Sequence, residues 1–378
     1  MSNGPGIVLP VCKTVIAGSG VAAMRFASRI RPSAAGSTVI ASERDWGWFS
    51  SFPREWRLGQ SRRALSPPGA EFWDPRGKRT AEEQVRQMIS EATEAVMKFP
   101  SDQLGYIQAS VTSVNKLGPK NCVVRYSNNY LQPCERVVIC SGVGPEKDLT
   151  ASGVKFLNSP TGPRVLLYEA TTALKAMEQG SKWFAGKRLA IYGGGATAAW
   201  MGEAAFLWGG EVGAWLSPNG FAGANPGGRN NDIMDWTEHV RHEGKINMIT
   251  FEGDTAYGRG LLANVQLGRA KTKADWNFDA IIAATGADPL APTGIQSVLG
   301  LGYQSLKPIH LGNPAGLIAV DDDGTIIVTS PALAADPTWS GDFGPVFANL
   351  ETENQIAAGI RVTELSAEAA ANYFESTR

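Results

Sequence analysis

Two glycines and an alanine near the start of the chain are spaced for contact with a phosphate group. Gly18, Gly20 and Ala23 form the pattern G-x-G-x-x-A directly after the apolar run 14–17. Such glycines permit a sharp turn and a close approach of backbone to pyrophosphate, while the alanine lets a helix pack closely on a strand. The first helical turn would direct unpaired N–H groups at an anion. We therefore predict a phosphate-binding loop that also includes Ser19, Val21 and Ala22.

A carboxylate follows at the distance that an adenine dinucleotide requires. The strand-like run 39–42 ends at Glu43, which lies 25 residues beyond Gly18. An acid at this point binds the ribose hydroxyls in dinucleotide-binding folds, although an acid that merely closes a strand would look the same. Because strand, glycines, helix, strand and acid occur in this order, we interpret Glu43 and its neighbour Arg44 as cofactor contacts.

The same arrangement recurs in the second half of the chain. The apolar run 188–192 leads into a second G-x-G-x-x-A pattern, and the next strand-like run ends at Ser217, 24 residues after Gly193. Each half also contains a buried-type run that ends in a small residue and a glycine. Such internal repetition predicts two dinucleotide-binding units in an α/β fold. The cofactor contacts predicted from these patterns are Ser141, Gly142, Gly193, Gly195, Ala196, Thr197, Ala198, Ser217, Thr285 and Gly286.

Composition and charge limit the class of function. The 378 residues are 43% hydrophobic and 19% charged, values typical of an α/β enzyme with room for two domains. The net charge of −1 argues against a nucleic-acid partner, and no apolar run reaches the roughly 18 residues of a membrane span. The four cysteines form no C-x-x-C pair, which argues against a zinc or other metal site. The N-terminus lacks a signal-peptide pattern, so we expect a cytoplasmic protein.

The chain resembles the flavoproteins with two dinucleotide domains, the group of glutathione-reductase-like enzymes, flavin-containing monooxygenases and N-hydroxylating monooxygenases. The resemblance rests on GSGVAA with Glu43, VVICSG, FAGKRLAIYGGGATA, FDAIIAATGADP and VDDDGTIIV…PVFANLE. It implies FAD on the first unit, NADPH or NADH on the second, and a C-terminal return to the FAD domain. The expected fold is therefore two Rossmann-like domains, the second inserted into the first, with boundaries at 1–155, 156–305 and 306–378.

The chain departs from this group at several positions. It lacks the cysteine pair of the disulfide reductases, and Thr161–Val165 lacks the histidine of the flavin-containing monooxygenase fingerprint. Leu350-Glu351 stands where the group has Gly-Asp, so the resemblance assigns the last FAD contacts to Asn349, Leu350 and Glu351. The strand that ends at Ser217 carries no acid, which leaves Arg229 as a candidate contact for a nicotinamide-nucleotide phosphate.

A loop rich in tryptophan and arginine follows Glu43 and supplies the candidates for catalysis, Trp46, Trp48, Arg54 and Arg57. Flat aromatic rings and guanidinium groups suit a flavin ring and an anionic substrate. The same residues would equally suit a structural insert.

The resemblance implies an NAD(P)H-driven monooxygenase that hydroxylates a small-molecule substrate through a flavin peroxide. One alternative is an FAD-dependent oxidase or dehydrogenase whose nicotinamide domain is vestigial. Another is a flavin-binding protein that serves as a non-catalytic partner. A homodimer is an assembly that the sequence leaves open.

Overall fold

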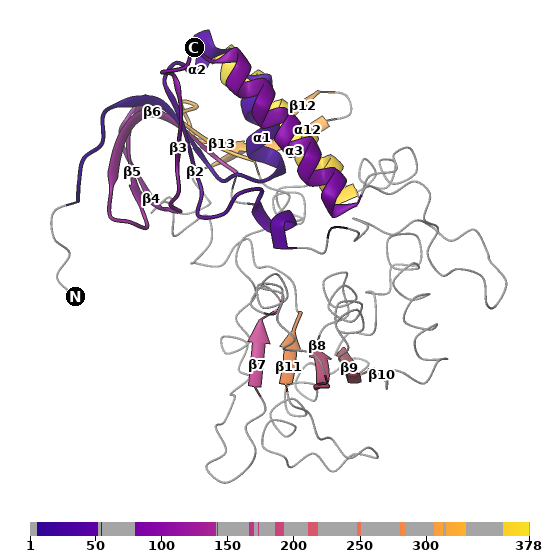
Figure 1. Cartoon of the computed structure of the whole chain (residues 1–378). Coiled ribbons are helices and arrows are strands. Elements are labelled where there is room, and N and C mark those ends of the chain that lie inside the picture. Colours follow the sequence, from indigo (N-terminus) through magenta and orange to yellow (C-terminus); the bar gives the residue numbers. More distant parts are fainter. Residues whose placement is uncertain are drawn as a thin grey trace. The chain divides into compact units, whose positions relative to one another are not determined.

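The computed structural model of the protein describes residues 6–51, 54, 80–140, 142, 166–169, 173, 186–192, 211–217, 248–250, 280–284, 306–312, 315–329 and 358–377 (Figure 1). The chain divides into two units. The first comprises residues 1–59, 77–145 and 288–378, and the second comprises residues 60–76 and 146–287. The predicted domain boundaries at 155 and 305 stay predictions because both positions lie outside the described residues.

The first unit is built on a sheet of nine described strands around β1 (Cys12–Ala17). The strand order is β12-β13-β14-β6-β1-β2-β3, and β5 joins the sheet through β6. The strands from β14 to β3 run parallel, whereas β12, β13, β4 and β5 pair in antiparallel hairpins. Their bounds are β2 Thr38–Ala41, β3 Leu104–Ile107, β4 Val111–Gly118, β5 Asn121–Tyr126, β6 Leu131–Ile139, β12 Lys307–Gly312, β13 Ala315–Val320 and β14 Ile326–Val328.

Apolar strand sequences account for the core of this sheet. Central parallel strands are covered on both faces and need nearly continuous apolar residues. Val15 and Ile16 of β1 are fully buried, as are Val137 and Val138 in β6 and Ile327 in β14. The central strands thus hold the carboxyl end of β1 in a rigid frame.

Three helices gather on one face of this sheet, as Figure 1 shows: α1 (Val21–Arg29), α3 (Ala81–Lys98) and α12 (Ala358–Ser376). Shorter elements are α2 (Pro32–Ala35) and the 3-10 helix η1 (Gly47–Ser51). Helix α12 packs on β13 at Gly316, where a Cβ atom would lie 2.2 Å from the Leu365 carbonyl oxygen. The missing side chain at Gly316 lets the C-terminal helix approach the sheet.

The buried face of α3 differs from the one that the spacing predicts. The pattern of Val85, Met88, Ile89, Ala92, Ala95 and Val96 predicts that all six face the core. Met88 and Ala95 are buried, but Ile89 and Val96 are 44% and 64% exposed. Gln84 and Glu91 are buried instead. A buried glutamate fits this face because Glu91 pairs with an arginine on α1.

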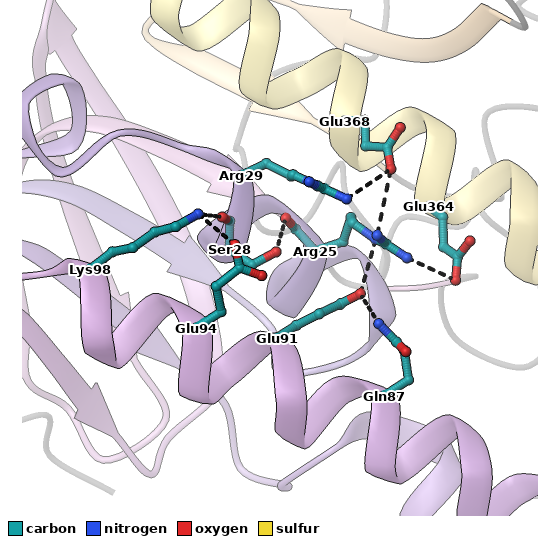
Figure 2. Close-up of polar contacts among 9 residues, drawn as sticks. All are labelled: Arg25, Ser28, Arg29, Gln87, Glu91, Glu94, Lys98, Glu364 and Glu368. Carbon is teal, nitrogen blue, oxygen red and sulfur yellow. Dashed lines mark hydrogen bonds and ion pairs between the residues drawn. The ribbon is translucent and has the colours of Figure 1, made fainter.

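That arginine, Arg25, joins all three helices (Figure 2). Its guanidinium lies 3.0 Å from Glu91 of α3, and 3.2 Å and 3.6 Å from Glu364 and Glu368 of α12. The Nε contact with Glu91 is an ion pair without hydrogen-bond geometry. Burial raises the pKa of Glu91, and Gln87 and Arg25 offset this effect in part. One cation on α1 therefore pairs with carboxylates from the two neighbouring helices.

A second group of charges joins the β4–β5 hairpin to the turn after β13. Lys116 Nζ lies 2.7 Å from a carboxylate oxygen of both Asp321 and Asp323. Although burial raises the pKa of Asp323, hydrogen bonds from Lys116 and Thr325 lower it to about 2. The turn is thus held by Lys116, which pairs with both aspartates.

The second unit contains a sheet of five described strands in the order β10-β9-β8-β11-β7, all parallel. The strands are β7 (Leu166–Glu169), β8 (Arg188–Tyr192), β9 (Glu211–Ser217), β10 (Met248–Thr250) and β11 (Ala280–Ala283). The chain runs from β8 to β9 and β10 on one side, and then to β11 on the other. This reversal is typical of a doubly wound sheet. Among the described helices of both units, none is long and apolar enough to cross a membrane.

Candidate functional site

The carboxyl ends of the parallel strands in the first unit form the place where a ligand would bind. β1 lies between β2, which follows it in the chain, and β6, which the chain reaches later from the other side. Ligands of open α/β sheets bind at such a switch point, outside the carboxyl ends of the strands. Hydrogen bonds from Gly18 N to Ala41 O and from Cys140 N to Ala17 O, both 2.8 Å, hold the three strand ends together.

The two glycines at the end of β1 are required for different reasons. Gly18 has φ +122°, and a Cβ atom there would lie 2.4 Å from the Cys140 carbonyl oxygen. The backbone conformation and the neighbouring strand therefore require a glycine at position 18. Gly20 has φ −82°, which any residue can adopt, and a Cβ atom there would meet none of the described atoms within 4 Å. Among the described residues, none fills the space above Gly20.

Helix α1 begins at this space with backbone hydrogen-bond donors that have no partner among the described residues. Gly20 is its N-cap residue, no described side chain caps the helix, and its first turn contains no acid. The first N–H groups of a helix have no intrahelical partner, so those of Val21, Ala22 and Ala23 are available to an anion. Ala23 is fully buried and lets α1 pack on the sheet. Backbone donors and the helix dipole make this a suitable position for a phosphate.

The predicted ribose acid lies beside this anion position. Glu43 follows the end of β2 and is exposed. Within the described part of the chain its carboxylate makes no hydrogen bond or ion pair, whereas the backbone around it is firmly held. The carbonyl oxygen of Arg44 accepts a hydrogen bond from Ser19 Oγ, which lies 3.0 Å from Ser42 Oγ. The buried Ser19 hydroxyl thus holds the backbone beside Glu43.

The start of the tryptophan- and arginine-rich loop lies against the glycines. Trp46 and Gly47 have φ +61° and +57°, and a Cβ atom on Gly47 would lie 3.2 Å from Gly20 Cα. Trp48 belongs to η1, and only its backbone is described. Arg54 is exposed, and its carbonyl accepts a hydrogen bond from Glu82 N at 3.0 Å. The structure therefore brings Trp46 close to the glycine turn and places Arg54 at the start of α3.

Two further predicted cofactor contacts, Ser217 and Gly142, lie among the described residues. Ser217 ends β9, where Thr250 of β10 pairs with it, and Gly142 has φ +77° just beyond β6. The remaining predicted residues lie outside the described residues: Arg57, Ser141, Gly193, Gly195, Ala196, Thr197, Ala198, Arg229, Thr285, Gly286, Asn349, Leu350 and Glu351.

All four cysteines are free and buried. Burial raises the pKa of the Cys12 and Cys122 thiols to about 12, and it also raises the pKa of Cys134 and Cys140. Reactive thiols are exposed and have a lowered pKa. These cysteines are therefore parts of the core.

Sequence reasoning missed two residues next to Glu43. Ser42 and Tyr106 both hydrogen-bond within the turn that carries this acid. Ser42 precedes Glu43 directly, so a search for short polar residues beside the acid would have found it. Tyr106 lies 63 positions after Glu43 and reaches the residues beside it, Ser42 and Asp45, only because β3 pairs with β2.

No protein-family model and no curated protein sequence matches the chain. Among solved structures, it is similar to the bacillithiol disulfide reductase Bdr (YpdA) from Staphylococcus aureus, with a TM-score of 0.57, 15% identity and coverage of 98% of this chain and 100% of that one. It is also similar to a flavin-containing monooxygenase from Stenotrophomonas maltophilia, with a TM-score of 0.54, 14% identity and coverage of 97% of this chain and 99% of that one.

A third similar structure is DfoA bound to FAD, a cadaverine monooxygenase of desferrioxamine biosynthesis from Erwinia amylovora. It has a TM-score of 0.52, 12% identity and coverage of 98% of this chain and 95% of that one. At these identities the similarity concerns the fold. The protein has the fold of the two-domain FAD/NAD(P) oxidoreductases, which confirms the predicted α/β class with two Rossmann-like domains, the second inserted into the first.

Proposed function

We propose that the protein is an FAD-dependent oxidoreductase and, within that class, an NAD(P)H-driven monooxygenase that acts on a small molecule. The observation that carries the proposal is the open space above Gly20. This glycine has an ordinary backbone conformation and, among the described residues, no neighbour that would exclude a side chain. A ligand that lies against this position would account for the glycine.

The residues around Gly20 suit an adenine dinucleotide. The uncapped N-terminus of α1 would hold the pyrophosphate, and the exposed Glu43 would accept hydrogen bonds from the ribose hydroxyls. Gly18 keeps β1 and β6 close enough for the turn to form. In this arrangement the protein binds and orients the cofactor through its backbone, and the bound flavin supplies hydride acceptance and oxygen activation.

The thiols favour a monooxygenase over a dithiol reductase. A dithiol relay needs cysteines that ionise near neutral pH. The four cysteines of this chain are buried and their pKa values are raised. Two of the similar solved structures are monooxygenases, which further supports this choice.

A pair of glycine variants tests the cofactor site. Gly20→Val should remove bound FAD, seen as loss of the flavin absorption bands, while the melting temperature changes little. Gly118→Val is the matched control, because a Cβ atom on Gly118 also meets none of the described atoms within 4 Å. Gly118 is the last residue of β4 and lies away from the carboxyl ends of the parallel strands. Full flavin occupancy in Gly20→Val would overturn the assignment.

Anaerobic reduction tests the proposed reaction. The flavin absorption of the purified protein should bleach on addition of NADPH or NADH and return when oxygen is admitted. Bleaching by neither nucleotide would replace the monooxygenase with an FAD-dependent oxidase or dehydrogenase. A colourless protein that takes up no FAD would leave only a non-flavin role.

A further inference from the structure

We infer that Tyr106 is a positioning residue for nucleotide binding, and that it holds Glu43 where the two hydroxyls of an adenosine ribose bind. Tyr106 acts together with Ser19, Ser42 and Asp45, and we call these four residues the Glu43 network. The inference rests on the proposed function, because it assumes that Glu43 binds a ribose. It adds residues that lie outside the glycine pattern and the acid itself.

The inner half of the Glu43 network joins the turn to the glycine loop. Ser19 Oγ lies 3.0 Å from Ser42 Oγ and also donates to the Arg44 carbonyl oxygen. Ser42 Oγ lies 2.8 Å from the same carbonyl oxygen. Ser19 is only 4% exposed, so this contact is shielded from competing water. The residues on both sides of Glu43 are thereby tied to the loop that would hold the pyrophosphate.

The outer half joins the turn to strand β3. The Tyr106 hydroxyl donates to Asp45 Oδ1 at 2.7 Å and lies 3.2 Å from the Ser42 carbonyl oxygen. Burial and the Asp45 carboxylate both raise the pKa of Tyr106, so its proton stays in place for donation. The Ser42 backbone N–H donates to Ile107 of the same strand at 3.1 Å. The turn 42–45 is therefore held from two sides.

Holding this turn matters because a ribose needs a fixed acceptor. A carboxylate accepts two hydrogen bonds from neighbouring hydroxyls only when it sits at the correct distance from the pyrophosphate position. Orienting groups before binding reduces the entropy that binding costs. The backbone of Glu43 is oriented while its carboxylate makes no contact with the described residues, so the network favours a ribose with both hydroxyls free.

The experiment compares two ligands that differ by one hydroxyl. ADP and 2′-deoxy-ADP are titrated calorimetrically into the full chain after removal of any bound flavin. A charge-assisted hydrogen bond corresponds to about a tenfold preference for ADP in the parent protein. Tyr106→Phe should reduce this preference to about threefold or less. A change that only destabilised the fold would lower the affinities for both ligands equally and leave the ratio of the two affinities unchanged.

Three further variants separate the explanations. Asp45→Asn keeps an acceptor for the tyrosine hydroxyl and should retain the preference, whereas Asp45→Ala should lose it as Tyr106→Phe does. Tyr130→Phe removes a tyrosine hydroxyl near the β5–β6 turn and should leave the preference for ADP unchanged.

The outcomes distinguish this inference from the proposed function. An unchanged ADP preference in Tyr106→Phe and Asp45→Ala would overturn the role of the Glu43 network. A parent protein that binds neither ADP nor FAD would overturn the dinucleotide site itself. A parent that binds ADP but shows no preference over 2′-deoxy-ADP would remove the ribose role of Glu43 and this inference with it.

Discussion

Replacing Arg25 with methionine should destabilise the protein by about 3 to 5 kcal/mol near neutral pH. The side chains of Glu91 and Glu364 are only 5% and 2% exposed, and Arg25 lies within 3.2 Å of both. Methionine keeps the length of the side chain but removes the cation that pairs with both buried carboxylates. Breaking a buried pair in this way costs far more than losing a surface pair, because the remaining charge stays desolvated.

The stability lost in Arg25→Met should become smaller as the pH falls. Burial already raises the pKa of Glu91 in the folded protein, and removing Arg25 should raise it further. A carboxyl whose folded pKa exceeds its unfolded value contributes most stability below the unfolded pKa, and this stability is lost as pH rises through the folded pKa. The difference between parent and Arg25→Met should therefore shrink as pH falls from 7.5 towards 5.

Urea unfolding of both proteins at pH 7.5 and pH 5.5 measures this difference. Arg29→Met is the matched control, because Arg29 is 51% exposed and lies 4.0 Å from Glu368, so its loss should cost about 1 kcal/mol or less. A cost below about 1 kcal/mol for Arg25→Met, or one that grows on acidification, would refute the reasoning.

Two other changes test the strand ends and the turn after β13. Gly18→Ala should cost about 2 to 4 kcal/mol in thermal or urea unfolding, because φ +122° and a Cβ atom 2.4 Å from the Cys140 carbonyl force a backbone shift; parental stability would contradict this. Asp323 has a folded pKa lowered to about 2, so its contribution is present above its unfolded pKa and lost as pH falls from about 4 towards 2. Asp323→Asn should cost about 1 kcal/mol at pH 7 and nothing near pH 2, and an equal cost at both would argue against an ionised pair.

Local patterns were enough to predict much of the fold. Strand, glycine turn, helix and acid follow one another within residues 12–43, and each step depends on neighbouring residues in the chain. The predicted run at 14–17 corresponds to β1 with its start shifted by two residues, and the spacing of apolar residues from Val85 to Val96 corresponds to α3. A period of two or of 3.6 residues is a property of the backbone, so the sequence displays it directly.

The distinct roles of the two glycines required the tertiary structure. In sequence, Gly18 and Gly20 are equivalent members of one pattern. In the structure, the Cys140 carbonyl, more than 120 residues away in the chain, restricts Gly18, whereas none of the described residues restricts Gly20. The difference arises because β6 pairs with β1, and strand pairing between distant segments leaves no local signal.

The amino-acid sequence by itself determined the order of elements, the repeat of two dinucleotide units and the place of Glu43, because these follow from local spacing. Only the tertiary structure decided which face of α3 is buried. Glu91 is buried because it pairs with Arg25 on another helix, whereas the apolar Ile89 is exposed. It likewise decided that Tyr106 meets Asp45 across paired strands. Charge pairing and strand register join residues that are distant in the chain, and their energies depend on burial, which exists only once the chain has folded.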